Sequence, residues 1–155
     1  MTVRSVEDLL RDTRLFADLP PHHLETIAGC AVTARFDEGA HVFREGGPAD
    51  TFYVIRSGTV ALETHMPGRG PARLVTLHDG DVLGWSWLFP PFRWHLDALA
   101  LEPVAAVAFD GVCLRRKAEE DHDLGYELMR RFAEVIVSRL QATRLQLLDV
   151  YRHDG

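Results

Sequence analysis

The chain has 155 residues, with 17 basic and 23 acidic side chains and a formal net charge of −6. This is the length of one domain, and 46% hydrophobic with 26% charged residues is ordinary for a soluble globular protein. The composition excludes collagen-like, disordered and disulfide-scaffold classes, and no apolar run approaches the roughly 18 residues of a membrane span. The negative charge disfavours a surface dedicated to nucleic acid, because such binding depends on neutralising phosphates.

The cysteines and the first residues bear on the cellular location. Cys30 and Cys113 stand far apart in the sequence and form no CxxC motif. This spacing suits a reducing cytosol and argues against iron–sulfur or zinc sites. The first twelve residues carry acids and no apolar core, so they do not resemble a secretory signal. We therefore expect a cytoplasmic protein that is not associated with a membrane.

Residues 1–30 are predicted to be helical. Ser5 followed by Asp8 resembles a capping pair, in which a side-chain oxygen accepts from a free N–H of the first turn. The proline pair at 20–21 ends this pattern and is typical of a new helix start, after which Leu24 and Ile27 share one face.

Residues 31–111 are predicted to be β-structure. Short apolar runs recur about every ten residues with glycine or proline between them, which is typical of a β-sandwich or barrel. The runs are 40–43, 51–55, 59–63, 73–77, 82–83 and 104–109. Residues 66–73, with the sequence MPGRGPAR, are predicted to form an exposed hairpin tip.

Residues 112–155 are predicted to be helical, with two apolar stripes. The first comprises Leu124, Leu128, Phe132 and Val135. The second steps by four and three residues, as in a heptad seam that two supercoiled helices share. It comprises Met129, Ala133, Ile136, Leu140, Thr143, Leu147 and Val150. Because one helix cannot bury two stripes against one barrel, we expect the second to form a homodimer; the alternative is a long helix that wraps its own domain.

Fixed spacings of glycine, acidic and apolar residues between 36 and 60 carry a family resemblance. The pattern is Phe36, Gly39, Val42-Phe43, Glu45-Gly46, Ala49-Asp50, Phe52 to Ile55, Gly58 and Val60. This pattern resembles the cyclic nucleotide-binding domain family, and Gly80-Asp81 matches the same family further along the chain. Segment 139–143 is similar to the dimer helix of bacterial regulators of the catabolite-activator type.

The resemblance implies an α+β, mainly β fold. Its core is a double-stranded β-helix (jelly-roll) β-roll with N-terminal helices and a long C-terminal dimerisation helix. We expect one domain with three parts: a helical segment at 1–30, the β-roll at 31–111 and the C-terminal helices at 112–155.

The resemblance also implies a phosphate-binding cassette between two late strands, here residues 84–98. In the family a Gly-Glu pair begins a short helix whose N–H groups meet the cyclic phosphate, the glutamate accepts from the ribose, and an arginine pairs with the phosphate. Gly84 matches the glycine and Arg93 the arginine. Trp85 stands at the glutamate position, and Trp94 follows the arginine where a small hydroxyl residue is usual. Because indole has a donor and no acceptor, we expect weak or no affinity for cyclic AMP.

All three tryptophans of the chain lie within this cassette, and three interpretations stay open. They fill a collapsed pocket, or they stack on a flat ligand whose anionic end Arg93 holds, or they contact another protein. The candidate ligand-binding residues are Gly84, Trp85, Ser86, Trp87, Arg93, Trp94, His95 and Thr143. Thr143 matches the dimer-helix threonine that reaches the nucleobase, and its alternative role is a tolerated polar residue in the seam. No cofactor is certain; the candidate ligand is a nucleotide or another flat anion.

These observations predict a non-enzymatic regulatory or sensor module that signals through a protein partner. The alternative is a scaffold or regulatory subunit whose degenerate pocket binds no cyclic nucleotide. The sequence lacks a Gly-x-Ser-x-Gly elbow, a P-loop and a metal-ligand spacing of histidines, so we expect no catalysis. Related transcription factors append a DNA-binding unit after the long helix, whereas here only residues 151–155 follow, so we expect no direct DNA binding.

Overall fold

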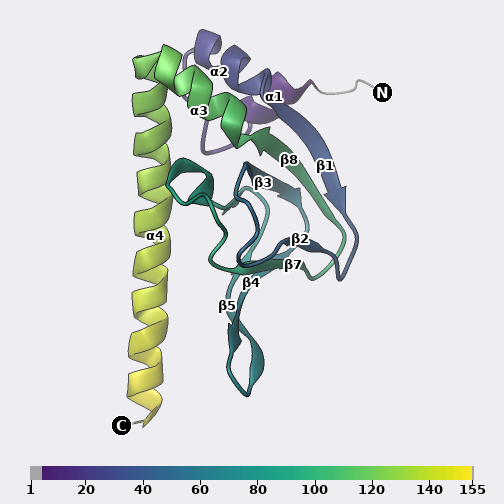
Figure 1. The fold of residues 1–155 in the computed structure, drawn as a ribbon, viewed down its shortest axis with the longest axis vertical. Helices are drawn as coiled ribbons and strands as arrows, with labels where there is room; N and C mark the ends of the chain where they lie inside the picture. The colour runs from purple at the N-terminus through teal and green to yellow at the C-terminus, as the bar shows by residue number, and fades with distance from the viewer. Residues whose placement is uncertain (1–4, 155) are drawn as a thin grey trace.

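In the computed structural model, which describes residues 5–154, two four-stranded antiparallel sheets form a β-roll with helices on either side in sequence (Figure 1). One sheet has the order β1-β8-β3-β6 and the other β2-β7-β4-β5. The strands are β1 (Ala31–Phe36), β2 (His41–Phe43), β3 (Thr51–Ser57), β4 (Val60–Met66), β5 (Gly70–Leu77), β6 (Val82–Leu83), β7 (Asp97–Ala100) and β8 (Val104–Asp110). The helices are α1 (Val6–Arg11), α2 (Pro21–Ala28), the 3-10 turn η1 (Ser86–Leu88), α3 (Gly111–Glu120) and α4 (His122–Asp154). The predicted fold class is confirmed.

Each of the six predicted runs lies on a strand, and β1 and β7 complete the roll. β1 pairs with β8 from Ala31 opposite Phe109 to Phe36 opposite Val104. The exposed hairpin tip is shorter than predicted, because β5 already begins at Gly70 and pairs there with Met66 of β4. The pairing of β1 with β8 places the end of β8 beside the start of β1.

Local capping explains where the helices begin. The Ser5 hydroxyl accepts from the Asp8 N–H at 3.1 Å, as the sequence predicts. The C-terminal helical region is interrupted once, at Asp121, whose carboxylate accepts from the N–H groups of Asp123 and Leu124. These hydrogen bonds satisfy free donors of the first turn of α4 and separate it from α3.

α4 buries its first stripe and leaves the second largely exposed. Leu124, Leu128 and Phe132 are at most 1% exposed and belong to the core cluster that joins the N-terminal helices to the roll. Leu140 and Leu147 are 60% and 54% exposed, and the helix runs on past the roll (Figure 1). The alternative of one helix that wraps its own domain is therefore wrong, and the homodimer stays a prediction.

The expectation drawn from the cysteines requires correction. Cys30 and Cys113 form a disulfide with a Cα–Cα distance of 5.9 Å, although 83 residues separate them in the sequence. The pairing of β1 with β8 carries the end of α2 to the start of α3, so distance in sequence is not distance in space. The cysteine spacing therefore gives no support for a reducing cytosol.

Candidate functional site

The cassette is the loop between β6 and β7, and it lies against α4 (Figure 1). It starts at Gly84, whose φ of +95° is in the left-handed region that favours glycine. A Cβ at this position would lie 2.5 Å from the ring of Trp94, so no side chain fits there. The cassette glycine thus serves two needs, a turn and a close aromatic contact.

Trp94 is fixed in this position from both sides. Its ring stacks on Phe43 at a centroid distance of 3.8 Å and is 6% exposed. Its backbone N–H donates to the Gly47 carbonyl, and its carbonyl accepts from the Gly46 N–H. Trp94 therefore fills the space beside the backbone of Gly84.

Trp87 belongs to the core. It is 0% exposed, stacks on Phe52 at 4.7 Å and meets the edge of Phe132 at 5.2 Å. Its indole N–H has no hydrogen-bond partner among the described residues. Arg115 of α3 donates to the Trp87 carbonyl. Trp87 anchors η1 between the roll and α4 and presents no surface to a ligand.

Trp85 contacts the long helix. The Arg139 guanidinium lies 5.1 Å from the centre of its ring and donates to the Val82 carbonyl. Burial lowers the pKa of Arg139, and the charge of Asp81 opposes that shift. Arg139 was not among the predicted site residues, although it stands one helical turn before Thr143, which was.

The remaining predicted residues lie apart from this packing. Arg93 is exposed and donates to the Gly46 carbonyl at 3.2 Å, and His95 is exposed as well. Ser86 is half-buried in η1. Thr143 is exposed on α4, and its hydroxyl donates to the Arg139 carbonyl at 2.9 Å. The structure thus brings Gly84 and Trp94 together, and Trp85 with α4.

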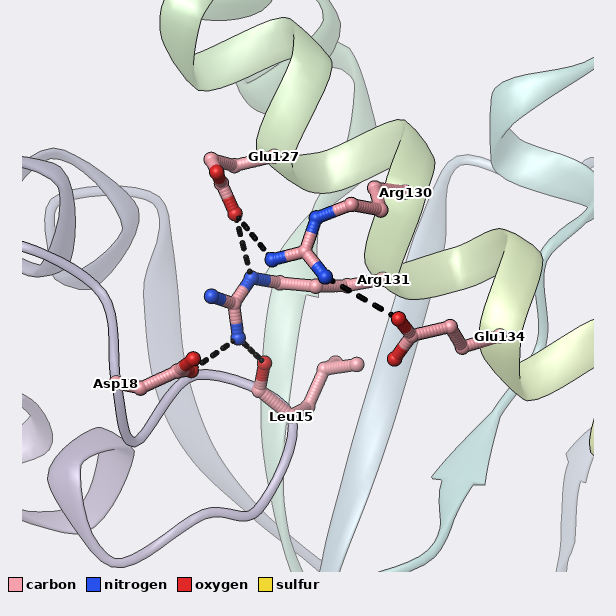
Figure 2. Close-up of polar contacts among 6 residues, drawn as sticks. All are labelled: Leu15, Asp18, Glu127, Arg130, Arg131 and Glu134. Atoms are coloured by element: carbon pink, nitrogen blue, oxygen red, sulfur yellow. Dashed lines mark hydrogen bonds and ion pairs between the residues drawn. The ribbon is translucent and has the colours of Figure 1, made fainter.

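A cleft of about 690 Å³ lies between α4, the loop after α1, and the turn from β5 to β6. Arg131 is one of the residues that line it and is 7% exposed. It donates to the Leu15 carbonyl and the Asp18 carboxylate, both at 2.6 Å, and to Glu127 at 3.2 Å (Figure 2). These contacts join α4 to the loop after α1. The contacts of Arg131 with Leu15 and Asp18 could not be predicted from the sequence, because 116 and 113 residues separate the partners.

No three or more histidine, cysteine, aspartate or glutamate side chains of the described residues are placed to bind a metal ion. None of the helices in this part of the chain combines the length and apolar character needed to cross a membrane.

Comparisons with known proteins agree with this architecture. The sequence profile of the "Cyclic nucleotide-binding domain" matches residues 33–121. A CRP-like cAMP-activated global transcriptional regulator of Mycobacterium tuberculosis is 26% identical over 145 residues, which is 94% of this chain and 63% of the regulator. The chain thus spans less than two-thirds of that curated relative.

Solved structures give the same result. A Geobacter metallireducens protein named for cyclic nucleotide binding has a TM-score of 0.79 at 28% identity, covering 90% of this chain and 99% of that one. A cyclic nucleotide-binding domain from Methylobacillus flagellatus shares the fold with a TM-score of 0.79 at 15% identity, covering 94% and 82% of the two chains. With the profile matching more than half of its residues, the chain belongs to the cyclic nucleotide-binding domain family.

Proposed function

We propose that the chain is a non-enzymatic regulatory module of this family whose phosphate-binding cassette is filled by its own Trp94, and that it signals through α4 to a protein partner. The observation that carries the proposal is the contact of Trp94 with Gly84. An anion at this turn needs free backbone N–H groups and room beside them. The Trp94 ring leaves no room for even one carbon atom at Gly84.

Two free-energy terms oppose binding of cyclic AMP. Moving Trp94 out of the cassette gives up its stacking on Phe43, which contributes roughly 0.5–1.5 kcal/mol. Trp85 offers the ribose hydroxyl no acceptor, and an unpaired buried polar group costs about 1–3 kcal/mol. Each 1.4 kcal/mol is about tenfold in affinity, so the two terms together weaken binding by roughly tenfold to a thousandfold or more.

Calorimetric titration with cyclic AMP tests the proposal. We expect the wild-type protein to show no binding tighter than about 100 µM. The double variant Trp85→Glu/Trp94→Ser restores the acid and the small hydroxyl residue that the family motif implies, and we expect it to bind more tightly. Sub-micromolar binding by the wild type would overturn the proposal.

Binding of a flat anionic ligand other than cyclic AMP is the second candidate function. Arg93 is exposed beside the cassette, and the half-buried Trp85 ring has surface left to stack on. Because all three tryptophans are in the cassette, their emission should report such a ligand in a panel of nucleotides that includes cyclic dinucleotides. Any ligand found should lose more affinity with Arg93→Ala than with His95→Ala. Unchanged emission across the panel would reject this function.

We propose that the module signals as a homodimer formed through the second stripe of α4. The exposed second stripe of α4 supports it, since a heptad seam is buried most simply by a second copy. A cytoplasmic location and the absence of direct contact with DNA or membrane also stay part of the proposal.

A further inference from the structure

The disulfide joins two segments that lie on either side of the roll in sequence. Cys30 follows α2 and is 7% exposed, whereas Cys113 is in the first turn of α3 and is partly exposed. The Asp110 N–H donates to the Cys30 carbonyl at 2.8 Å, and the Asp110 carboxylate accepts from the Cys113 N–H at 3.0 Å. Asp110 therefore makes a backbone contact with each of the two cysteines.

The first turn of α3 also contacts the cassette. A Cβ at Gly111 would lie 3.0 Å from the Cβ of Trp87, so the helix starts directly against this tryptophan. One turn later, Arg115 donates to the Trp87 carbonyl, and its guanidinium lies 4.1 Å from the centre of the Phe92 ring. The first two turns of α3 thus carry Cys113 together with Gly111 and Arg115, which contact η1 and the loop after it.

The two sulfur atoms differ in accessibility. Cys113 is the more exposed, and it lies in the first turn of the ten-residue α3. Cys30 is buried beside it and is placed to resolve a mixed disulfide. This is the arrangement of an attacking and a resolving cysteine.

We propose that Cys30 and Cys113 form a reversible redox site that reacts with small-molecule disulfides and thiols, and that its state controls the cassette through α3. For oxidation, the Cys113 thiolate attacks one sulfur of a disulfide RSSR and expels RS⁻, which takes up the proton that Cys113 lost. The Cys30 thiol then loses its proton and attacks the Cys113 sulfur of the mixed disulfide, releasing a second RSH. Two electrons pass from the protein to RSSR, giving one protein disulfide and two RSH; reduction is the reverse.

The oxidised state ties the first turn of α3 to the end of α2. In the reduced state this turn loses its covalent link to the end of α2 and keeps only hydrogen bonds, among them those of Asp110 and the one from the Gly111 N–H to the Asp50 carbonyl, so η1 and the loop after it open more often. The inference does not depend on whether the cassette binds a ligand.

The test equilibrates the full-length protein in glutathione buffers of increasing oxidised fraction. Acid quenching, alkylation and intact mass then give the fraction of disulfide, while tryptophan emission and amide hydrogen exchange report on residues 84–94. We expect a single two-electron transition, with the same midpoint whether it is measured by intact mass or by tryptophan emission. We also expect the amides of the cassette to exchange about tenfold faster in the reduced protein than in the oxidised protein. The Cys30→Ser/Cys113→Ser variant should show no dependence on the buffer.

Arg115→Gln provides a second variant. It leaves both cysteines in place, so the disulfide should still form, while the emission change should shrink because the contact from α3 to the Trp87 carbonyl is lost. Two outcomes overturn the proposal: both thiols stay open to alkylation at every glutathione ratio, or the disulfide forms with the same emission and exchange in both states.

Discussion

The two halves of α4 carry apolar residues at the same helical spacing and have opposite environments. Phe132 in the first half has no exposed surface, whereas Leu140 and Leu147 in the second are more than half exposed. Hydrophobic periodicity specifies which face of a helix is apolar and leaves open what covers that face. The first half is part of the domain core, and the second is an apolar surface that the described residues leave exposed.

The largest expected effect is a difference in unfolding free energy between substitutions in the two halves of α4. Phe132→Ala removes a ring that contacts Phe52 and Trp87, and should lower the free energy of unfolding by about 3–5 kcal/mol. Leu148→Ala in the exposed half is the control and should stay within about 0.5 kcal/mol. Urea denaturation measures both. Equal losses would mean that the second half is packed as tightly as the first.

The next effect concerns association. Leu140→Glu/Leu147→Glu places two charges in the predicted seam and should weaken dimerisation at least about a hundredfold, since burying each leucine is worth roughly 1.5–3 kcal/mol. Light scattering at micromolar concentration measures the molecular mass, and circular dichroism should show an unchanged fold.

The matched control is Leu145→Glu/Leu148→Glu. These leucines are equally exposed on the same helix but lie outside the seam, so this variant should stay dimeric. A wild-type protein that runs as a clean monomer, or two variants with the same mass, would contradict the dimer.

The β-roll could be predicted because its turns are chemically marked. Gly58 shows why: its φ is +101°, and a Cβ there would lie 2.5 Å from the Pro103 carbonyl, so the residue type follows from the local backbone. β7, with the sequence DALA, carries no such mark, since its strand character comes from pairing with β2 and β4. Local chemistry is visible in a sequence, and pairing between distant strands is not.

The same distinction applies to the candidate site. The cluster of tryptophans and the match of Gly84 to the cassette glycine were evident from the sequence. Which tryptophan lies against Gly84 depends on Phe43 of β2, which lies outside the cassette, and on its stacking with Trp94. The disulfide was missed for the same reason: only the pairing of β1 with β8 brings Cys30 to Cys113.

The smallest expected effect is a dependence of the folding stability on pH, which arises from ion pairs of the packed first half of α4. The Arg131 hydrogen bond holds the pKa of Asp18 below its ordinary value of 3.8. The Arg130 and Arg131 hydrogen bonds hold the pKa of Glu127 below 4.5. A carboxyl whose pKa is lower in the folded than in the unfolded state stabilises the fold above its unfolded pKa, and this contribution is lost as the pH falls through the folded value.

The urea midpoint of the wild type should therefore fall as the pH drops below about 4.5. Arg131→Met removes the partner of Asp18 and one partner of Glu127, so its midpoint should be lower at neutral pH and fall less steeply in acid. The difference in slope is small, because the Asp18 side chain is 74% exposed and solvent screens the pair. Arg144→Met in the exposed half is the control, and its curve should run parallel to the wild type. Parallel curves for all three proteins would show that the contacts of Arg131 with the loop after α1 do not stabilise the first half of α4 through charge.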